Sequence, residues 1–182
     1  MTKSMTGSFY LTETVALPLA TASGARVTGT IDLSAYVNVP TGQAIAIESV
    51  DFIYQVSSDF GTDAASMLAG NGAISVQLTD LNSGNAFVRG DNHSLVASGG
   101  LNVDQANNIA THTTDLYPDN FGPTNLSEAF LVVNDSLFIT AGPDGTQIGG
   151  VEVFVTARVR ARVVKLSTKD WMAIAIQSTA DQ

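Results

Sequence analysis

The residues of this sequence that can do acid–base or metal chemistry are few and widely spaced. There are two histidines, His93 and His112, and no cysteine. Neither an HxH nor an HExxH spacing occurs, so the sequence lacks the paired imidazoles that such motifs supply to zinc. It also lacks a G-x-S-x-G nucleophile motif and a glycine-rich phosphate loop. We therefore expect a protein that is not an enzyme and that uses no cofactor and no small-molecule substrate.

Carboxylates are more numerous, and several lie in polar segments between apolar ones. The candidates are Asp59, Asp63, Asp115, Asp119 and Asp144. Such oxygens can bind Ca²⁺, and two facing carboxylates can hydrolyse a glycoside. None of these residues has the spacing of a known calcium loop, so most of them are expected to stabilise turns and loops. Calcium binding and acid catalysis stay open as lesser alternatives.

The basic residues are unevenly distributed, because five of the eight lysines and arginines lie between Arg158 and Lys169. Residues 151–166, VEVFVTARVRARVVKL, alternate strictly between apolar and other residues, which predicts one long, half-buried strand. The alternation places Arg158, Arg160 and Arg162 on the face opposite the valines. We call these three residues the arginine row.

Neighbouring members of the arginine row are expected to be about 6.6 Å apart, since a strand rises about 3.3 Å per residue. Two such charges repel by about 0.6 kcal/mol in water and about 2.5 kcal/mol at an effective dielectric constant of 20. Dry burial of the row therefore requires facing anions. Three sources stay open: acidic side chains of the next strand or of a neighbouring copy, phosphates of a nucleic acid, and an anionic membrane surface.

Composition limits the remaining possibilities. The chain has 182 residues, 45% of them hydrophobic and 14% charged, which predicts one folded domain spanning 1–182 rather than a disordered chain. A formal net charge of −9 opposes non-specific binding of nucleic acid by the molecule as a whole. The first residues contain no apolar segment of a secretory signal, and no run is long enough to span a membrane. We expect a soluble, cytoplasmic protein.

Alternation with period two, interrupted by Gly, Pro, Asn and Asp, predicts an all-β chain. The expected strands are 8–17, 25–33, 43–56, 73–81, 86–89, 101–109, one or two strands within 128–142, and 151–166. The apolar positions change phase between Ile47 and Val50, which predicts a β-bulge near Glu48 and Ser49. The segment 73–89 is expected to form a hairpin, and 90–127 a long polar loop apart from its one short strand.

Two short helices are also expected. The first lies near 62–70, with Thr62 or Asp63 as its cap and Gly70 at its end. The second lies near 168–178, with Ser167 as its cap and Asp170 at the third position. About eight antiparallel strands with no long helix indicate a β-sandwich of the jelly-roll type.

Two groups of apolar residues are candidate contact sites. In the C-terminal segment Trp171, Met172, Ile174 and Ile176 are expected to dock, either on the sandwich of their own chain or on a partner. In the polar loop, Tyr117 and Phe121 are candidate loop contacts.

In its overall plan the chain resembles the single jelly-roll major capsid proteins of icosahedral viruses. The resemblance lies in the length, the strands QAIAIESVDFIYQV and VEVFVTARVRARVV, and the polar segment 90–127. It implies a virion protein, assembled in the host cytoplasm, whose copies join one another and other capsid proteins in capsomers of a closed shell. Lys3 is the only charged residue before Glu13, so the basic arm by which many capsid proteins bind the genome is missing. This departure favours a shell without such arms or one that encloses a membrane, which the arginine row would contact.

The alternative function is that of a carbohydrate- or receptor-binding β-sandwich module in a fibre or surface assembly. Such modules present exposed aromatic side chains, and Tyr117 and Phe121 are the candidates.

Overall fold

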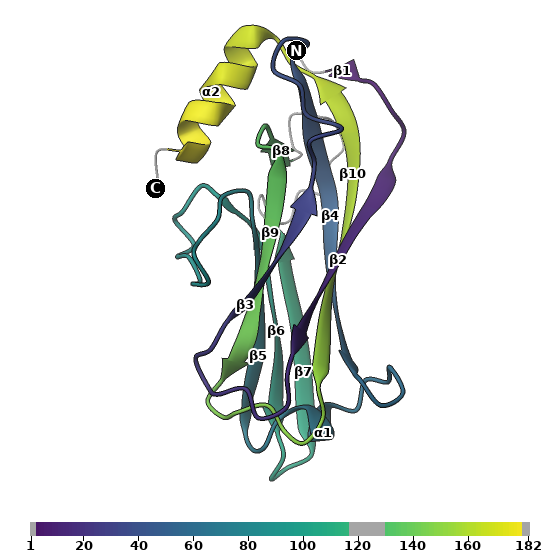
Figure 1. Cartoon of the computed structure of the whole chain (residues 1–182), viewed down its shortest axis with the longest axis vertical. Coiled ribbons are helices and arrows are strands. Elements are labelled where there is room, and N and C mark those ends of the chain that lie inside the picture. Colours follow the sequence, from purple (N-terminus) through teal and green to yellow (C-terminus); the bar gives the residue numbers. More distant parts are fainter. Residues whose placement is uncertain (1–2, 117–129, 180–182) are drawn as a thin grey trace.

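The computed structural model describes residues 3–116 and 130–179 (Figure 1). Its strands are β1 (Lys3–Ser4), β2 (Phe9–Leu17), β3 (Val27–Asp32), β4 (Gln43–Val56), β5 (Gly72–Thr79), β6 (Leu95–Asp104), β7 (Ile109–Leu116), β8 (Phe130–Val132), β9 (Ser136–Asp144) and β10 (Val153–Lys165). The helices are α1 (Ala64–Met67) and α2 (Thr168–Thr179).

The strands form two antiparallel sheets that face each other (Figure 1). Sheet I has the order β2-β10-β4-β8, with β1 pairing with the last residues of β10 beyond the end of β2. Sheet II has the order β3-β9-β5-β6-β7. From β2 to β10, consecutive strands lie in different sheets except for β5, β6 and β7, which all lie in sheet II, so most connections cross from one sheet to the other, as in a jelly roll. The prediction of an all-β jelly roll is confirmed.

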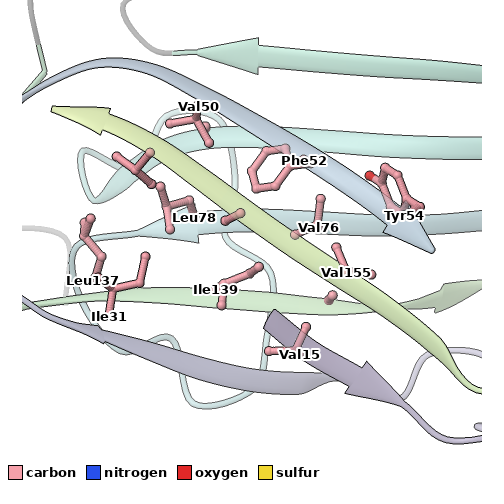
Figure 2. Packing of buried hydrophobic residues seen from close by; sticks show 14 of the residues in the cluster. Val15, Ile31, Val50, Phe52, Tyr54, Val76, Leu78, Leu137, Ile139 and Val155 are labelled. Carbon is pink, nitrogen blue, oxygen red and sulfur yellow. The ribbon is translucent and has the colours of Figure 1, made fainter. Parts of the chain in front are cut away.

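The core lies between the inner faces of the two sheets. On β10, every second residue from Val153 to Ala161 is completely buried, while the arginine row points away from the core. Figure 2 shows side chains from β4 and β10 of sheet I meeting those of Val76, Leu78 and Ile139 from sheet II. Each buried valine or isoleucine contributes about 1.5 to 3 kcal/mol through the area that it removes from water, so this layer stabilises the sandwich.

The β-bulge predicted near Glu48 and Ser49 is present. Arg160 pairs with Ser49 and the next residue, Ala161, pairs with Ile47, so Glu48 is the extra residue on β4. The insertion lets Ile47 and Val50, which are three positions apart, both face the core. It also turns Glu48 toward the outer side of sheet I, where its carboxylate meets the arginine row.

The hairpin predicted for 73–89 is wrong. Both edges of β5 are occupied, one by β6 and the other by β9, so residues 86–89 cannot join the ladder. They lie over the outer side of sheet II instead, where the Gln77 side chain binds the backbone of Val88. The Gln77 amide nitrogen donates to the Val88 carbonyl at 3.0 Å, and its oxygen accepts from the Val88 N–H at 2.8 Å.

The segment from 90 to 116 is more regular than predicted. The expected strand 101–109 is wrong in extent, because that range contains the end of β6, a turn and the first residue of β7. The turn has Asn108 in the left-handed region with φ 54°. Two consecutive glycines, Gly99 and Gly100, interrupt the apolar alternation of β6, and three of the eight residues of β7 are threonines. The pattern that identifies strands is therefore weak here.

Within 128–142 the structure contains two strands, β8 and β9, which do not pair with each other. Strand β8 pairs with β4 in sheet I, and β9 pairs with β3 and β5 in sheet II. The residues around Asn134 and Asp135 therefore carry the chain from one sheet to the other.

Helix α2 has the predicted position, and the Asp170 N–H donates to the Ser167 hydroxyl at 3.2 Å, as expected of a cap. Helix α1 is shorter than the predicted 62–70. Asp63 makes no side-chain cap hydrogen bond, and the chain leaves the helix at Leu68, which is extended. Leu68 forms a β-bridge with Ile148, which ends the helix before Gly70.

Candidate functional site

The arginine row lies on the outer face of sheet I, at its central strand. Strand β10 has β2 on one side and β4 on the other, so Arg158 and Arg160 are flanked by two strands, whereas Arg162 lies beyond the last residue that pairs with β2. In register, Arg158 lies between Thr12 and Asp51, and Arg160 lies between Tyr10 and Ser49.

Glu48 neutralises two members of the row. The Arg160 Nε lies 3.2 Å from one carboxylate oxygen of Glu48, and the Arg162 Nη1 lies 2.9 Å from the other. The Ser8 hydroxyl donates to the same carboxylate at 2.8 Å. The exposed fraction of the side chain is 10% for Glu48, 22% for Arg162 and 52% for Arg160. One of the three anion sources, an acidic side chain of the next strand, is therefore present within the chain.

Arg158 has a different environment from the other two arginines. Its guanidinium carbon lies 5.0 Å from the ring centroid of Tyr10, a cation–π contact between β10 and β2. Among the described residues Arg158 belongs to no ion pair, and Asp51 is its exposed neighbour on β4. Tyr10 is 57% exposed. This end of the row therefore presents an aromatic ring and a cation to solvent.

An aromatic pair lies on the same face of β10, where Phe154 precedes Arg158 by four residues. Phe154 stacks with Phe60 at a centroid distance of 6.2 Å, and Phe60 is 64% exposed. Phe60 has φ 59°, a left-handed conformation that is unfavourable for a bulky side chain. Three hydrogen bonds hold the loop in place: Phe60 N–H to Val56 carbonyl, Val56 N–H to Gly61 carbonyl, and the Gln55 amide to the Phe60 carbonyl.

Phe60 is a candidate contact residue that sequence reasoning missed. The available signal was an aromatic residue inside the turn sequence SSDFG, where a polar residue is usual. By contrast, Tyr117 and Phe121, the loop residues selected from the sequence, lie outside the described residues.

The candidate docking residues of the C-terminal segment divide into two groups. Trp171 and Ile174 pack on the outer side of sheet I, on a small apolar cluster that contains Ala44, Ala46 and Val164. Met172 and Ile176 lie on the exposed side of α2. Helix α2 thus docks on its own chain and presents two further apolar side chains outward.

The carboxylates considered for calcium do not gather into a site where the structure describes them. Asp59 accepts a hydrogen bond from the Gly61 N–H at 2.8 Å, and Asp144 forms an ion pair with Arg26 at 2.7 Å. The Asp115 and Asp119 side chains lie outside the described ones. Within 3–116 and 130–179, no group of three or more His, Asp or Glu side chains that could hold a metal ion is present.

The two histidines lie apart, and neither is part of a metal site in the described chain. His112, on β7, meets the ring of Tyr54 edge-on at a centroid distance of 5.3 Å. Neither α1 nor α2 has the length and apolarity needed to cross a membrane.

No protein-family model and no curated protein sequence matches the chain. Among solved structures it is similar to VP1 of Merkel cell polyomavirus, with 11% identity over 90% of this chain and 98% of the other and a TM-score of 0.41. A chain of Desmodium yellow mottle tymovirus has 4% identity, coverage of 89% and 91%, and a TM-score of 0.31. A chain from Maize chlorotic mottle virus has 13% identity, coverage of 91% and 93%, and a TM-score of 0.28. The structural likeness to viral jelly-roll capsid proteins thus has low identity and high coverage.

Proposed function

We propose that this chain is a structural protein whose copies self-assemble through the outer face of sheet I into the capsomers of an icosahedral capsid. The observation that carries the proposal is the set of exposed Tyr10, Arg158 and Phe60 side chains on one sheet face. Tyrosine, phenylalanine and arginine are the side chains that are enriched in protein interfaces, and tyrosine and arginine recur among the residues with the largest binding energies.

Charge supports self-association through this face. The molecule carries a formal net charge of −9, so two copies repel each other in most orientations. On this face, however, the two nearby carboxylates, Glu48 and Asp51, nearly balance the three cations of the arginine row, so two copies that meet through it repel each other less. Since Arg158 and Asp51 lie side by side, a two-fold contact can place each arginine against the aspartate of the other copy.

The same charges favour a protein partner over nucleic acid or lipid. Glu48 already pairs with Arg160 and Arg162, which leaves one arginine of the row without an anion of its own chain in the described structure. Binding to phosphates gains from several unneutralised cations. A single cation flanked by an aromatic ring and a carboxylate suits a mixed protein surface better.

The step from self-association to a capsid rests on analogy of fold. Jelly rolls occur in viral capsids, in lectins and in cupins, so the fold alone does not select among them. The proposal places the protein in the virion, with copies of itself and other capsid proteins as partners.

The proposal is tested by sedimentation and negative-stain microscopy of the purified protein. The unmodified chain is expected to form oligomers or particles, and the double variant Tyr10→Ala, Phe60→Ala is expected to be monomeric at the same concentration. Ile109→Ala is the matched control, because Ile109 is 55% exposed but lies on β7 of sheet II. A monomeric unmodified chain across salt and pH, or equal assembly of all variants, would contradict the proposal.

The alternative, a carbohydrate-binding module, has one observation in its favour. Phe60 stands out from the surface on a hydrogen-bonded loop, and a sugar ring could stack on it. A glycan array with hits that vanish in Phe60→Ala, combined with a monomeric protein, would select this function instead.

A further inference from the structure

A cavity of about 290 Å³ lies between the two sheets, where β4 passes β7 and the short helix α1. Its lining includes Phe52 and Tyr54 of β4, Ala64 and Met67 of α1, Leu101 of β6, and His112 of β7. Phe52, Met67 and Leu101 are buried, whereas His112 is exposed, so His112 marks the side that opens to solvent. The walls are largely apolar, and this cavity is distinct from the outer face of sheet I.

One polar group in this apolar setting has no partner. Tyr54 is only 5% exposed, and its buried hydroxyl makes no hydrogen bond to any described residue. The neighbouring His112 ring meets Tyr54 edge-on, at 81°, and does not satisfy the hydroxyl. Figure 2 shows Tyr54 in the row of side chains that β4 sends into the core, beside Phe52. Burial raises the pKa of the Tyr54 hydroxyl, so it is a neutral hydrogen-bond donor at physiological pH.

A buried hydroxyl without a partner loses its hydration and gains nothing in return. Buried polar groups are normally hydrogen-bonded, so each exception calls for a physical reason. A ligand oxygen that accepts a hydrogen bond from the Tyr54 hydroxyl would supply one. The apolar walls exclude a charged or strongly hydrated ligand, because its desolvation would not be compensated.

The volume limits the size of the ligand. An apolar cavity of about 150 Å³ holds benzene, so one about twice as large accommodates roughly ten to twelve non-hydrogen atoms. Largely apolar walls with a small number of well-placed polar groups, here Tyr54, Thr62 and His112, are typical of small-molecule sites. We propose that this cavity binds a small apolar molecule with a single acceptor oxygen, such as an aryl ketone, ether or ester, through a hydrogen bond from the Tyr54 hydroxyl.

The proposal is tested with two probes of the same shape. Acetophenone carries a carbonyl oxygen, and α-methylstyrene has a CH₂ group in its place. Calorimetric titration of the full chain is expected to show saturable binding of both, with acetophenone about five- to tenfold tighter. In Tyr54→Phe, acetophenone is expected to lose that advantage, while the affinity for α-methylstyrene stays unchanged. This variant keeps the aromatic ring and removes only the unpaired hydroxyl, so it should remain folded.

A second variant tests the location. Ala64→Leu adds a larger side chain to the lining and is expected to abolish binding of both probes. Ala65→Leu is the matched control, because Ala65 is the next residue of the same helix but is exposed and does not line this cavity. It is expected to bind as the unmodified chain does.

Two results would contradict the proposed binding of a small molecule in this cavity. No saturable binding of either probe up to the solubility limit would show that the cavity holds only water and would overturn the inference. Equal affinity of acetophenone for the unmodified chain and Tyr54→Phe would also overturn it. Neither result bears on self-association, which depends on Tyr10, Phe60 and Arg158.

Discussion

The outer faces of the two sheets differ sharply, although their inner faces are alike. Both inner faces carry rows of buried valine, leucine and isoleucine. The outer face of sheet I carries the arginine row, two carboxylates and exposed aromatic rings. The outer face of sheet II carries uncharged polar residues and one glycine along β5 and β6: Ser75, Gln77, Ser98, Gly100 and Asn102.

The two outer faces also differ in what covers them. Residues 80–94 pass over sheet II and are held there by Gln77 and Val88. On sheet I, α2 covers the region around Ala44, Ala46 and Val164, whereas Arg158 and Arg160 at the centre of β10 are exposed. In a strand, one half of the alternating positions builds the sandwich and the other half is free to vary. The exposed side chains of Tyr10, Phe60 and Arg158 lie on the outer face of sheet I, the face that we propose for self-association.

The largest expected effect on stability is at Glu48, whose carboxylate forms ion pairs with Arg160 and Arg162 on the outer face of sheet I. Glu48→Gln should lower the free energy of unfolding by about 2 to 3 kcal/mol, because it leaves the largely buried Arg162 guanidinium without its anion. Urea denaturation measures the change. Asp51→Asn, on the same face of the same strand but exposed, is the control and should cost less than about 0.5 kcal/mol. Equal costs for the two variants would show that Glu48 is an ordinary surface residue.

An intermediate effect is expected on sheet II, where Gln77 holds the covering loop. Gln77→Ala removes two hydrogen bonds to the Val88 backbone and should cost about 1 to 2 kcal/mol of the free energy of unfolding. The amide hydrogen of Val88 should then exchange faster. Asn102→Ala, an exposed position of the same outer face, should change stability by less than about 0.5 kcal/mol. Unchanged exchange at Val88 would mean that other contacts hold the loop.

The smallest effect on stability is expected at Arg158. Arg158→Gln removes an exposed cation–π contact and should cost about 0.5 kcal/mol. Its self-association constant, measured by sedimentation equilibrium, should nevertheless fall about fivefold, which corresponds to about 1 kcal/mol. Arg89→Gln provides the control, since Arg89 is an exposed arginine outside sheet I. If Arg89→Gln weakens association as much, net charge rather than the outer face of sheet I controls it.

Much of the fold could be predicted from local patterns. Strand β10, its buried odd-numbered positions and the bulge at Glu48 follow from the alternation of residue types, which depends only on neighbouring residues. The sequence predicted a single strand at 101–109 in place of β6 and β7, because glycines in β6 and threonines in β7 weaken the alternation of apolar residues. The hairpin after β5 was wrong because a local turn signal cannot show that both edges of a strand are already occupied.

The candidate contact face was predicted only in part. The one-sided position of the arginine row follows from the period of a strand. The ion pairs of Glu48 with Arg160 and Arg162 depend on the register between two strands that are about a hundred residues apart, which no local pattern contains. The exposed position of the Phe60 side chain depends on the left-handed backbone conformation of Phe60 itself. Hydrogen bonds between neighbouring backbone groups of the loop fix that conformation, and no local sequence pattern contains them.

The bulge at Glu48 has a consequence for how the gene can change. Replacing the codon for residue 48 preserves the number of residues between Ile47 and Val50, so both side chains keep their inward direction. An in-frame loss of that codon would leave Ile47 and Val50 two positions apart, which is the spacing of a regular strand, so both side chains would still face inward. The deletion would remove the bulge and the carboxylate that Arg160 and Arg162 share, but not the packing of Ile45 and Ile47 in the core. A change in length at this position should therefore affect the charges of the outer face and not the hydrophobic interior.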